Sequence, residues 1–191
     1  MPYDASATRS RLIEAATREF AAHGLAGARV DRIADGAAAN KRAIYDYFTN
    51  KQGLFDTALA RVTDDLIQAI PLDENDLPDY AAELFDYLQK HPHTVRILAW
   101  QRLERPHAGP PIPKAFLEHI AQLRDRPRAK TSEQPLAPLD LIVLTIGLAN
   151  AWHLSAPALL ASQGIDPADP ERIARHRAAV IEATRRLAEP A

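Results

Sequence analysis

Apolar residues recur three or four positions apart along almost the whole of this 191-residue chain, and no segment alternates apolar and polar residues. Glycine occurs only seven times, and the sequence is rich in alanine and leucine, which are good helix formers. Because a half-buried strand requires strict alternation, this pattern argues against a sheet. The sequence therefore predicts an all-α fold with about nine helices.

Four helices are expected in the first part of the chain: at residues 6–23, a short helix carrying Val30 and Ile33, and helices at 41–48 and 51–70. Gly24 is the expected left-handed cap of the first helix. Further helices are expected at 77–90, 93–105, 113–126, 137–162 and 169–188, and Pro157 should break the fourth of these.

An acidic, proline-containing stretch at 71–79 is the expected domain boundary. It separates a small domain at 1–50, followed by a linking helix at 51–70, from a larger helical domain at 71–191. A polar stretch at 124–135 is expected to form a loop. The chain has enough residues for this arrangement, and its 47% hydrophobic content supports a buried core.

Composition argues against several classes of protein. The chain has no cysteine, a net charge of −2, and no run of eighteen apolar residues, so we expect no disulfide, no thiolate metal site and no membrane span. The N-terminus has no signal-peptide core, which indicates a cytoplasmic protein. His91 and His93 lack the carboxylate or cysteine partners of a metal site, and no nucleophile motif or nucleotide-binding glycine loop occurs. We therefore expect no enzyme, metal or cofactor.

The most informative segment is "NKRAIYDYFTNKQGLF", residues 40–55. Two short helices joined by a three- or four-residue turn, on a preceding amphipathic helix, have the dimensions of a helix-turn-helix. Asn40 is a good N-cap for the second helix, and Lys41 and Arg42 lie in its first turn, where backbone N–H groups favour a phosphate. Ile44 and Phe48 (or Tyr47) are expected to point inward.

This segment, together with "RLIEAATREFAAHGLAGARVDRIADGA" before it, resembles the N-terminal domain of the TetR family of bacterial transcriptional regulators. The resemblance implies an N-terminal three-helix helix-turn-helix domain (motif at about 29–48) and a C-terminal helical bundle for ligand binding and dimerisation. The turn departs from the family's usual Gly-Val-Ser, since it reads Ala38-Ala39-Asn40, and Arg29 stands where a threonine is common. The residues expected to contact DNA are Arg29, Asn40, Lys41, Arg42, Ala43, Tyr45, Asp46, Tyr47 and Lys51.

Some of these assignments have structural alternatives. Arg42 and Asp46 could form an intrahelical ion pair, or they could read bases. Tyr45 and Tyr47 lie on different sides of the helix, and each could pack in the core or offer its hydroxyl to a phosphate.

Two sets of residues are proposed in the C-terminal part. An effector pocket, or alternatively ordinary core, is expected from Trp100, Leu103, Phe116, Ile120, Trp152 and His153. A homodimer interface, implied by the resemblance, is expected from Ile142, Ile146, Ile173, Val180, Ile181 and Leu187.

The sequence thus predicts a DNA-binding transcriptional regulator, specifically a repressor. It would bind a palindromic double-stranded operator as a homodimer and be released by a small-molecule effector of unknown identity. The first alternative is an all-helical interaction protein without specific DNA readout, and the second is an α-helical enzyme.

Overall fold

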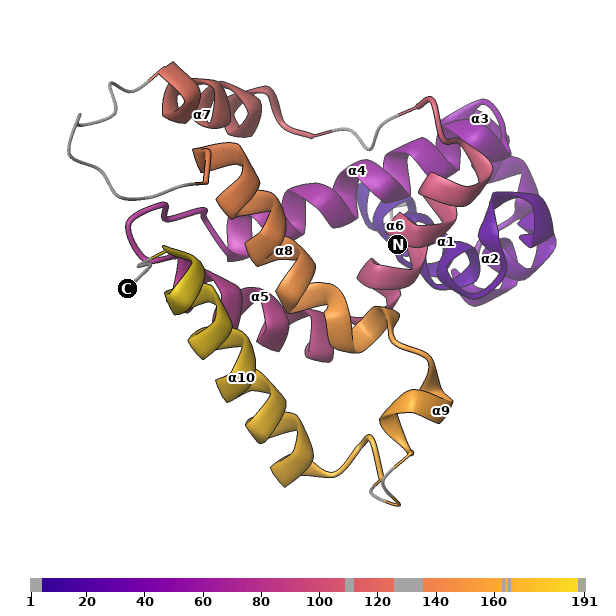
Figure 1. Cartoon of the computed structure of the whole chain (residues 1–191). Helices are drawn as coiled ribbons and strands as arrows, with labels where there is room; N and C mark the ends of the chain where they lie inside the picture. The colour runs from indigo at the N-terminus through magenta and orange to yellow at the C-terminus, as the bar shows by residue number, and fades with distance from the viewer. Residues whose placement is uncertain (1–4, 109–111, 126–135, 163, 165, 189–191) are drawn as a thin grey trace. The chain divides into compact units, whose positions relative to one another are not determined.

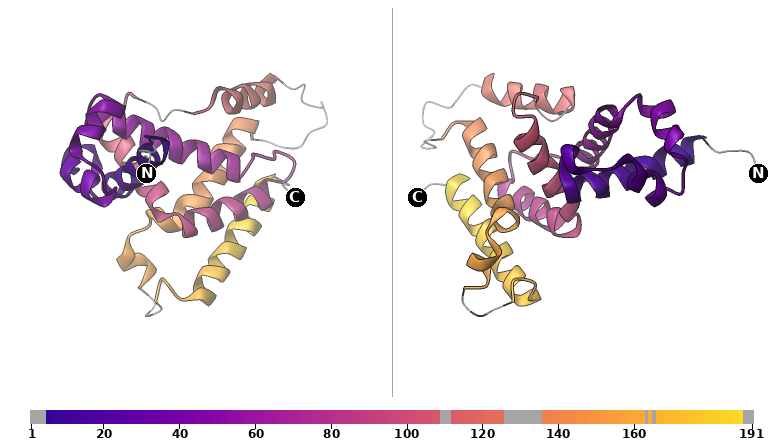
Figure 2. Two further views of the ribbon diagram at one scale, coloured as in Figure 1. Left: turned by 180° about the vertical axis from the view of Figure 1, so that it is seen from behind. Right: turned by 90° about the vertical axis from the view of Figure 1, so that its right-hand side faces the viewer.

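The computed structural model describes residues 5–108, 112–125, 136–162, 164 and 166–188. Within these ranges the regular secondary structure is entirely helical (Figures 1 and 2). The all-α prediction is confirmed, and the described ranges hold ten helices where about nine were expected. They are α1 (Ala5–Gly27), α2 (Val30–Gly36), α3 (Lys41–Phe48), α4 (Lys51–Ala69), α5 (Leu77–Lys90), α6 (Pro92–Glu104), α7 (Lys114–Asp125), α8 (Pro138–Leu154), α9 (Pro157–Leu160) and α10 (Pro170–Ala188). Residues 126–135 of the expected polar loop lie outside the described ranges.

The break expected at Pro157 accounts for the additional helix, because α8 ends at Leu154 and the single turn of α9 begins at Pro157. Every helix within the described residues is too short or too polar to cross a membrane.

The chain folds into two compact units. The head unit comprises Met1–Leu66 and His91–Pro113, and the C-terminal unit comprises Ile67–Lys90 and Lys114–Ala191. The head unit therefore includes α6, which lies within the range 71–191 of the expected larger domain. The functional division at residue 71 stays a prediction.

The core of the head unit is aromatic and aliphatic. Phe20 of α1 and Phe55 of α4 pack edge to face with ring centroids 5.0 Å apart. Ile44 and Phe48 of α3 are buried in the same core, as expected. The edge-to-face pair joins α1 to α4, and the buried side chains of α3 pack into the same core.

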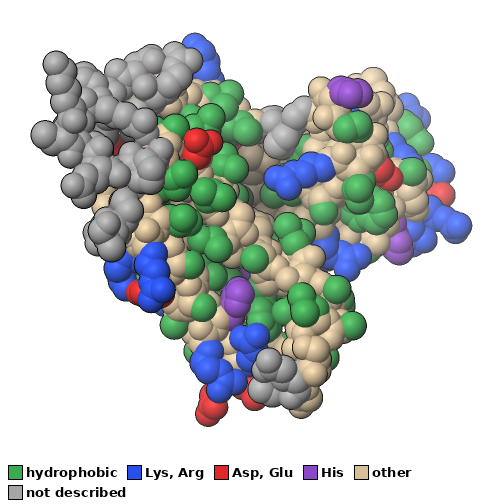
Figure 3. Space-filling model, viewed as in Figure 1, with side chains coloured by type: hydrophobic (Ala, Val, Ile, Leu, Met, Phe, Trp, Pro, Cys, Tyr) green, Lys and Arg blue, Asp and Glu red, His purple; other side chains and the backbone are tan. Residues whose placement is uncertain are grey.

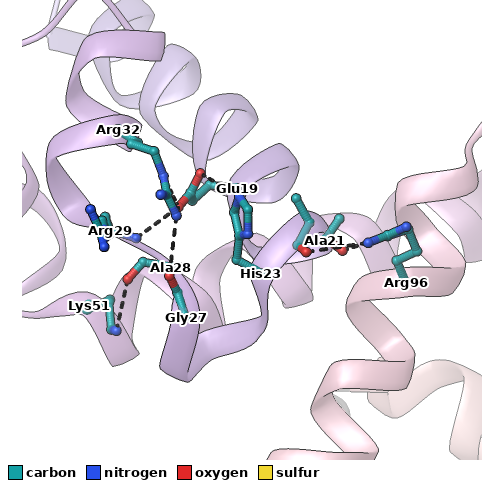
Figure 4. Close-up of polar contacts among 10 residues, drawn as sticks. Glu19, Ala21, His23, Gly27, Ala28, Arg29, Arg32, Lys51 and Arg96 are labelled. Atoms are coloured by element: carbon teal, nitrogen blue, oxygen red, sulfur yellow. Dashed lines mark hydrogen bonds and ion pairs between the residues drawn. The ribbon is translucent and has the colours of Figure 1, made fainter.

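Helix α6 packs along α1 in the head unit. Arg96 donates to the carbonyl of Ala21 at 2.7 Å (Figure 4), and Glu104 accepts from the backbone N–H groups of Leu25 and Ala26. Gly24 has a positive φ of 69°, as expected, but its ψ of −178° makes it a kink, after which α1 continues to Gly27. A Cβ there would lie 2.9 Å from the indole of Trp100.

In the C-terminal unit, α5 packs against α8 and α10. Arg177 of α10 reaches both carboxylate oxygens of Asp86 on α5 at 2.9 Å. The ring of Phe85 on α5 lies 5.6 Å from the rings of both His153 and His176. These contacts join three helices into one small bundle.

Gly53, in the first turn of α4, is a position where the backbone itself excludes a side chain. A Cβ there would lie less than 3.0 Å from the carbonyl oxygen of Phe48 at the end of α3. We predict that Gly53→Ala destabilises the protein by about 1–3 kcal/mol, because the end of α3 must shift away from α4. Urea unfolding measures this loss.

Gly36→Ala is the matched control, since its added Cβ meets Ala15 at an ordinary 3.6 Å. The control should be neutral or gain up to about 1 kcal/mol. Equal urea midpoints for the two variants would show that the α3–α4 junction accommodates the methyl group.

Candidate nucleic-acid interface

Helix α3 presents one side to the protein and the other to solvent. Lys41, Arg42, Tyr45 and Asp46, which we call the α3 outer face, are exposed. They fall at i, i+1, i+4 and i+5 and therefore lie on one side of the helix. Ala43, which was also expected to contact DNA, is only 8% exposed and packs in the head core, and a DNA contact by Ala43 stays a prediction.

The start of α3 is fixed by the turn before it. The side chain of Asn40 accepts from the N–H of Arg42 at 2.9 Å, which confirms the expected cap. Ala38 adopts a positive φ of 48°, so the turn keeps its shape without the usual glycine. The N–H of Ala39 bonds the carbonyl of Ala34, and Arg11 of α1 donates to the carbonyl of Ala37. Residues of α1 and α2 therefore set the position of α3.

Two ion pairs involve the cations of the α3 outer face. Lys41 Nζ lies 2.8 Å from Asp31 Oδ1 of α2, and the hydrogen bond to this carboxylate raises the pKa of Lys41. Arg42 Nε lies 3.9 Å from Asp46 Oδ2, beyond hydrogen-bond distance, and the Arg42 side chain is 86% exposed. Both cations can therefore reach a ligand in solvent.

Arg29 is positioned by its backbone rather than its side chain. Its N–H donates to Glu19 Oε1 at 2.9 Å, and Arg32 donates to the same oxygen (Figure 4). Burial alone would raise the pKa of Glu19, but hydrogen bonds from Arg32 and Arg29 outweigh it and lower this pKa. The buttressed Glu19 holds the start of α2, where the Arg29 side chain is exposed.

The two tyrosines differ, as their spacing predicts. Tyr45 is 47% exposed, whereas Tyr47 is half-buried beside Phe48. Lys51 was expected to contact phosphate, but its ammonium donates to the carbonyls of Ala26 and Ala28 (Figure 4). That contact gives Lys51 a structural role at the end of α1, and a phosphate contact by Lys51 stays a prediction.

The expected effector-pocket residues are divided between the two units. Trp100 and Leu103 belong to the head unit, where Leu103 is 73% exposed. Phe116, Ile120, Trp152 and His153 belong to the C-terminal unit. Ile120 packs beside the buried Leu77 and Ile142. A pocket formed by all six stays a prediction.

Two of the six residues expected at the dimer interface are buried within the single chain. Ile142 and Val180 are each 3% exposed, because they face the interior of their own α5–α8–α10 bundle. A contribution of these two residues to a dimer interface stays a prediction. Ile146, Ile173, Ile181 and Leu187 are half-buried.

Chemically, the α3 outer face offers a guanidinium, an ammonium and a phenol beside a capped helix start. These groups suit phosphate oxygens and the acceptor edge of guanine. Asp31, which pairs with Lys41, was missed in the sequence because ten residues separate the two and no helical spacing relates them. The described ranges contain no cluster of three His, Cys, Asp or Glu side chains that could hold a metal ion.

Comparisons with known proteins identify both parts of the chain. Residues 12–58 match the family model "Bacterial regulatory proteins, tetR family", and residues 76–186 match "Tetracyclin repressor-like, C-terminal domain". The chain is 38% identical over 160 residues to the HTH-type transcriptional repressor SCO4008 of Streptomyces coelicolor, covering 82% of this chain and 83% of that protein.

Two further relatives agree. The HTH-type transcriptional repressor NicS of Pseudomonas putida is 34% identical over 108 residues, covering 53% of this chain and 51% of NicS. The crystal structure of SCO4942 from Streptomyces coelicolor superposes with a TM-score of 0.79 at 37% identity, covering 94% of this chain and 97% of that one.

Proposed function

The chain belongs to the TetR family and is a DNA-binding transcriptional regulator, not an enzyme, and we propose that it represses transcription as a homodimer on a palindromic operator. A small-molecule effector releases the protein from this operator. The protein acts in the cytoplasm of a bacterium.

The observation that carries this proposal is the α3 outer face. Lys41, Arg42 and Tyr45 are exposed together on one side of a helix whose other side is locked into the head core. Arg29 and the Asn40 cap lie at the two helix starts of the same motif. A rigid helix carrying exposed cations can enter the major groove, with the flanking cations held against phosphates.

A second copy is proposed because one short helix reads too few base pairs, and two-fold symmetry doubles the site. Helix α8 supports this. Its solvent side carries Leu139, Val143, Gly147 and Ala151 at intervals of four residues, and Figure 3 shows hydrophobic side chains gathered over this helix. Val143 is 57% exposed, and a contiguous apolar stripe that is exposed to solvent is typical of an interaction surface. We call these four residues the α8 stripe and propose that it packs against a second copy.

Release requires that the effector bind the DNA-incompetent arrangement more tightly than the competent one. The interior of the C-terminal unit is the proposed location of the effector, with Phe116, Ile120, Trp152 and His153 among its candidate residues. No contact with DNA is proposed for that unit.

The test is the salt dependence of binding to DNA from upstream of the protein's own gene, followed by fluorescence anisotropy. Three cations in each of two copies (Arg29, Lys41 and Arg42) predict a log K against log salt slope of about −5. A scrambled DNA of equal length is the control and should bind at least about 1,000-fold more weakly. Equal binding of the two DNAs would support the interaction protein without specific readout.

A further inference from the structure

A pocket of about 240 Å³ lies within the C-terminal unit, between α8, α9 and α10. Its walls are formed by Trp152, Ser155, Leu159, Leu160, Ser162, Arg172 and His176. Sites for drug-sized ligands measure about 300–1,000 Å³, so the occupant of this pocket must be small. Trp152 is the one wall residue that sequence analysis had placed in an effector pocket.

Arg172 supplies a positive charge that forms no ion pair with any residue of the described ranges. Its guanidinium carbon lies 4.8 Å from the centroid of the Trp152 ring. A guanidinium carries five N–H donors, so its contact with the indole leaves donors for an anion.

His176 supplies an unused hydrogen-bonding group beside Arg172. Its ring lies 4.8 Å from that of Trp152, and its Nε2 is buried without a hydrogen-bond partner. Burial, and then the charge of Arg172, lower the pKa of His176, so the imidazole is neutral at pH 7. A buried nitrogen without a partner is costly, and a ligand that accepts a hydrogen bond from this nitrogen would remove that cost.

The remaining walls do not compete for the same role. The hydroxyls of Ser155 and Ser162 already donate to the carbonyls of Ala151 and Leu159, so neither hydroxyl has a proton left for an anion. Leu159 and Leu160 offer apolar surface. The pocket therefore combines one net positive charge, one neutral donor and an apolar wall.

We propose that this pocket binds a small apolar monocarboxylic acid, with its carboxylate accepting from Arg172 and His176 and its apolar body lying against Leu159 and Leu160. A single negative charge matches the single positive charge of the site, and charge-assisted hydrogen bonds favour the anion over its amide. The role of the acid as an effector rests on the proposed function. The binding of the acid to this pocket does not.

Benzoate is the probe, and the Trp100→Phe protein is the background, because Trp152 is then the only tryptophan. Titration should change the fluorescence of Trp152 saturably, with a Kd below about 1 mM for so small a ligand. Benzamide, which has the same shape without the charge, should bind at least about tenfold more weakly.

Arg172→Gln should weaken benzoate binding at least about tenfold, since it removes the charge. Arg175→Gln is the matched control, because Arg175 lies on the exposed side of the same helix. Equal affinity of benzoate for the Arg172→Gln and Arg175→Gln proteins overturns the proposal, as does equal binding of benzamide and benzoate.

A second measurement on the same protein and ligand tests the proposed function independently of the binding site. Anisotropy of labelled operator DNA, with and without benzoate, measures release directly. Saturable, Arg172-dependent binding with no loss of operator supports the site and contradicts the effector role. Failure to bind operator DNA at all contradicts the proposed function and leaves the titration result as evidence for the site.

Discussion

Operator affinity should fall by about 100-fold or more when Lys41 and Arg42 are both replaced by alanine. Each side chain contributes a contact to bases or phosphates, and two copies of the protein each lose both contacts. The fold should be unaffected, because both side chains are exposed and their partners Asp31 and Asp46 are exposed as well. Anisotropy with labelled operator DNA, alongside thermal unfolding, measures the two effects separately.

The matched control removes one lysine and one arginine from other exposed positions. Lys114 is the first residue of α7, as Lys41 is of α3, and Arg102 is exposed on α6. Lys114→Ala combined with Arg102→Ala should change operator affinity by less than about threefold. If the two double variants bind operator equally well, α3 is not the recognition helix.

Gly147→Arg should convert the proposed dimer into a monomer and lower operator affinity by about 10²–10⁴-fold. The two head units would then bind their half-sites separately and not as parts of one molecule. The substitution is mild for the single chain. An added Cβ at Gly147 meets nothing within 4 Å, and arginine is a better helix former than glycine by about 0.5–1 kcal/mol. Loss of binding therefore reports on the second copy, not on unfolding. Light scattering gives the mass.

Ala115→Arg is the control for Gly147→Arg, since Ala115 is an exposed small residue on α7 of the same unit. It should leave mass and operator affinity unchanged. A Gly147→Arg protein that keeps the mass of a dimer would exclude the α8 stripe as the interface.

The DNA-facing helix could be predicted closely because its determinants are local. Asn40 caps a helix whose inward residues, Ile44 and Phe48, are four positions apart, and both features depend only on neighbouring residues. Ala38, in the turn that departs from Gly-Val-Ser, adopts a positive φ. The bounds of α3 and α5 agree with those expected from caps and apolar spacing.

Other contacts could not be predicted from the sequence because they depend on which surfaces meet in three dimensions. Helix α8 is apolar on most sides, so periodicity could not tell that Ile142 faces its own bundle while Val143 faces solvent. Lys51 has the position of a phosphate-binding residue, yet it donates to the carbonyls of Ala26 and Ala28, which lie more than twenty residues earlier at and just after the end of α1. No local pattern encodes either outcome.

The packing of α6 on α1 has a consequence for anyone who would build chimeric regulators from this protein. A graft cut between α4 and α5 would transfer the helix-turn-helix without Arg96 and Glu104, which bind the backbone at the end of α1. It would also uncover the part of the head core in which Ile97 is fully buried. The portable piece is therefore discontinuous in sequence, and specificity is exchanged more safely by transplanting the exposed residues of α3 than by exchanging whole segments.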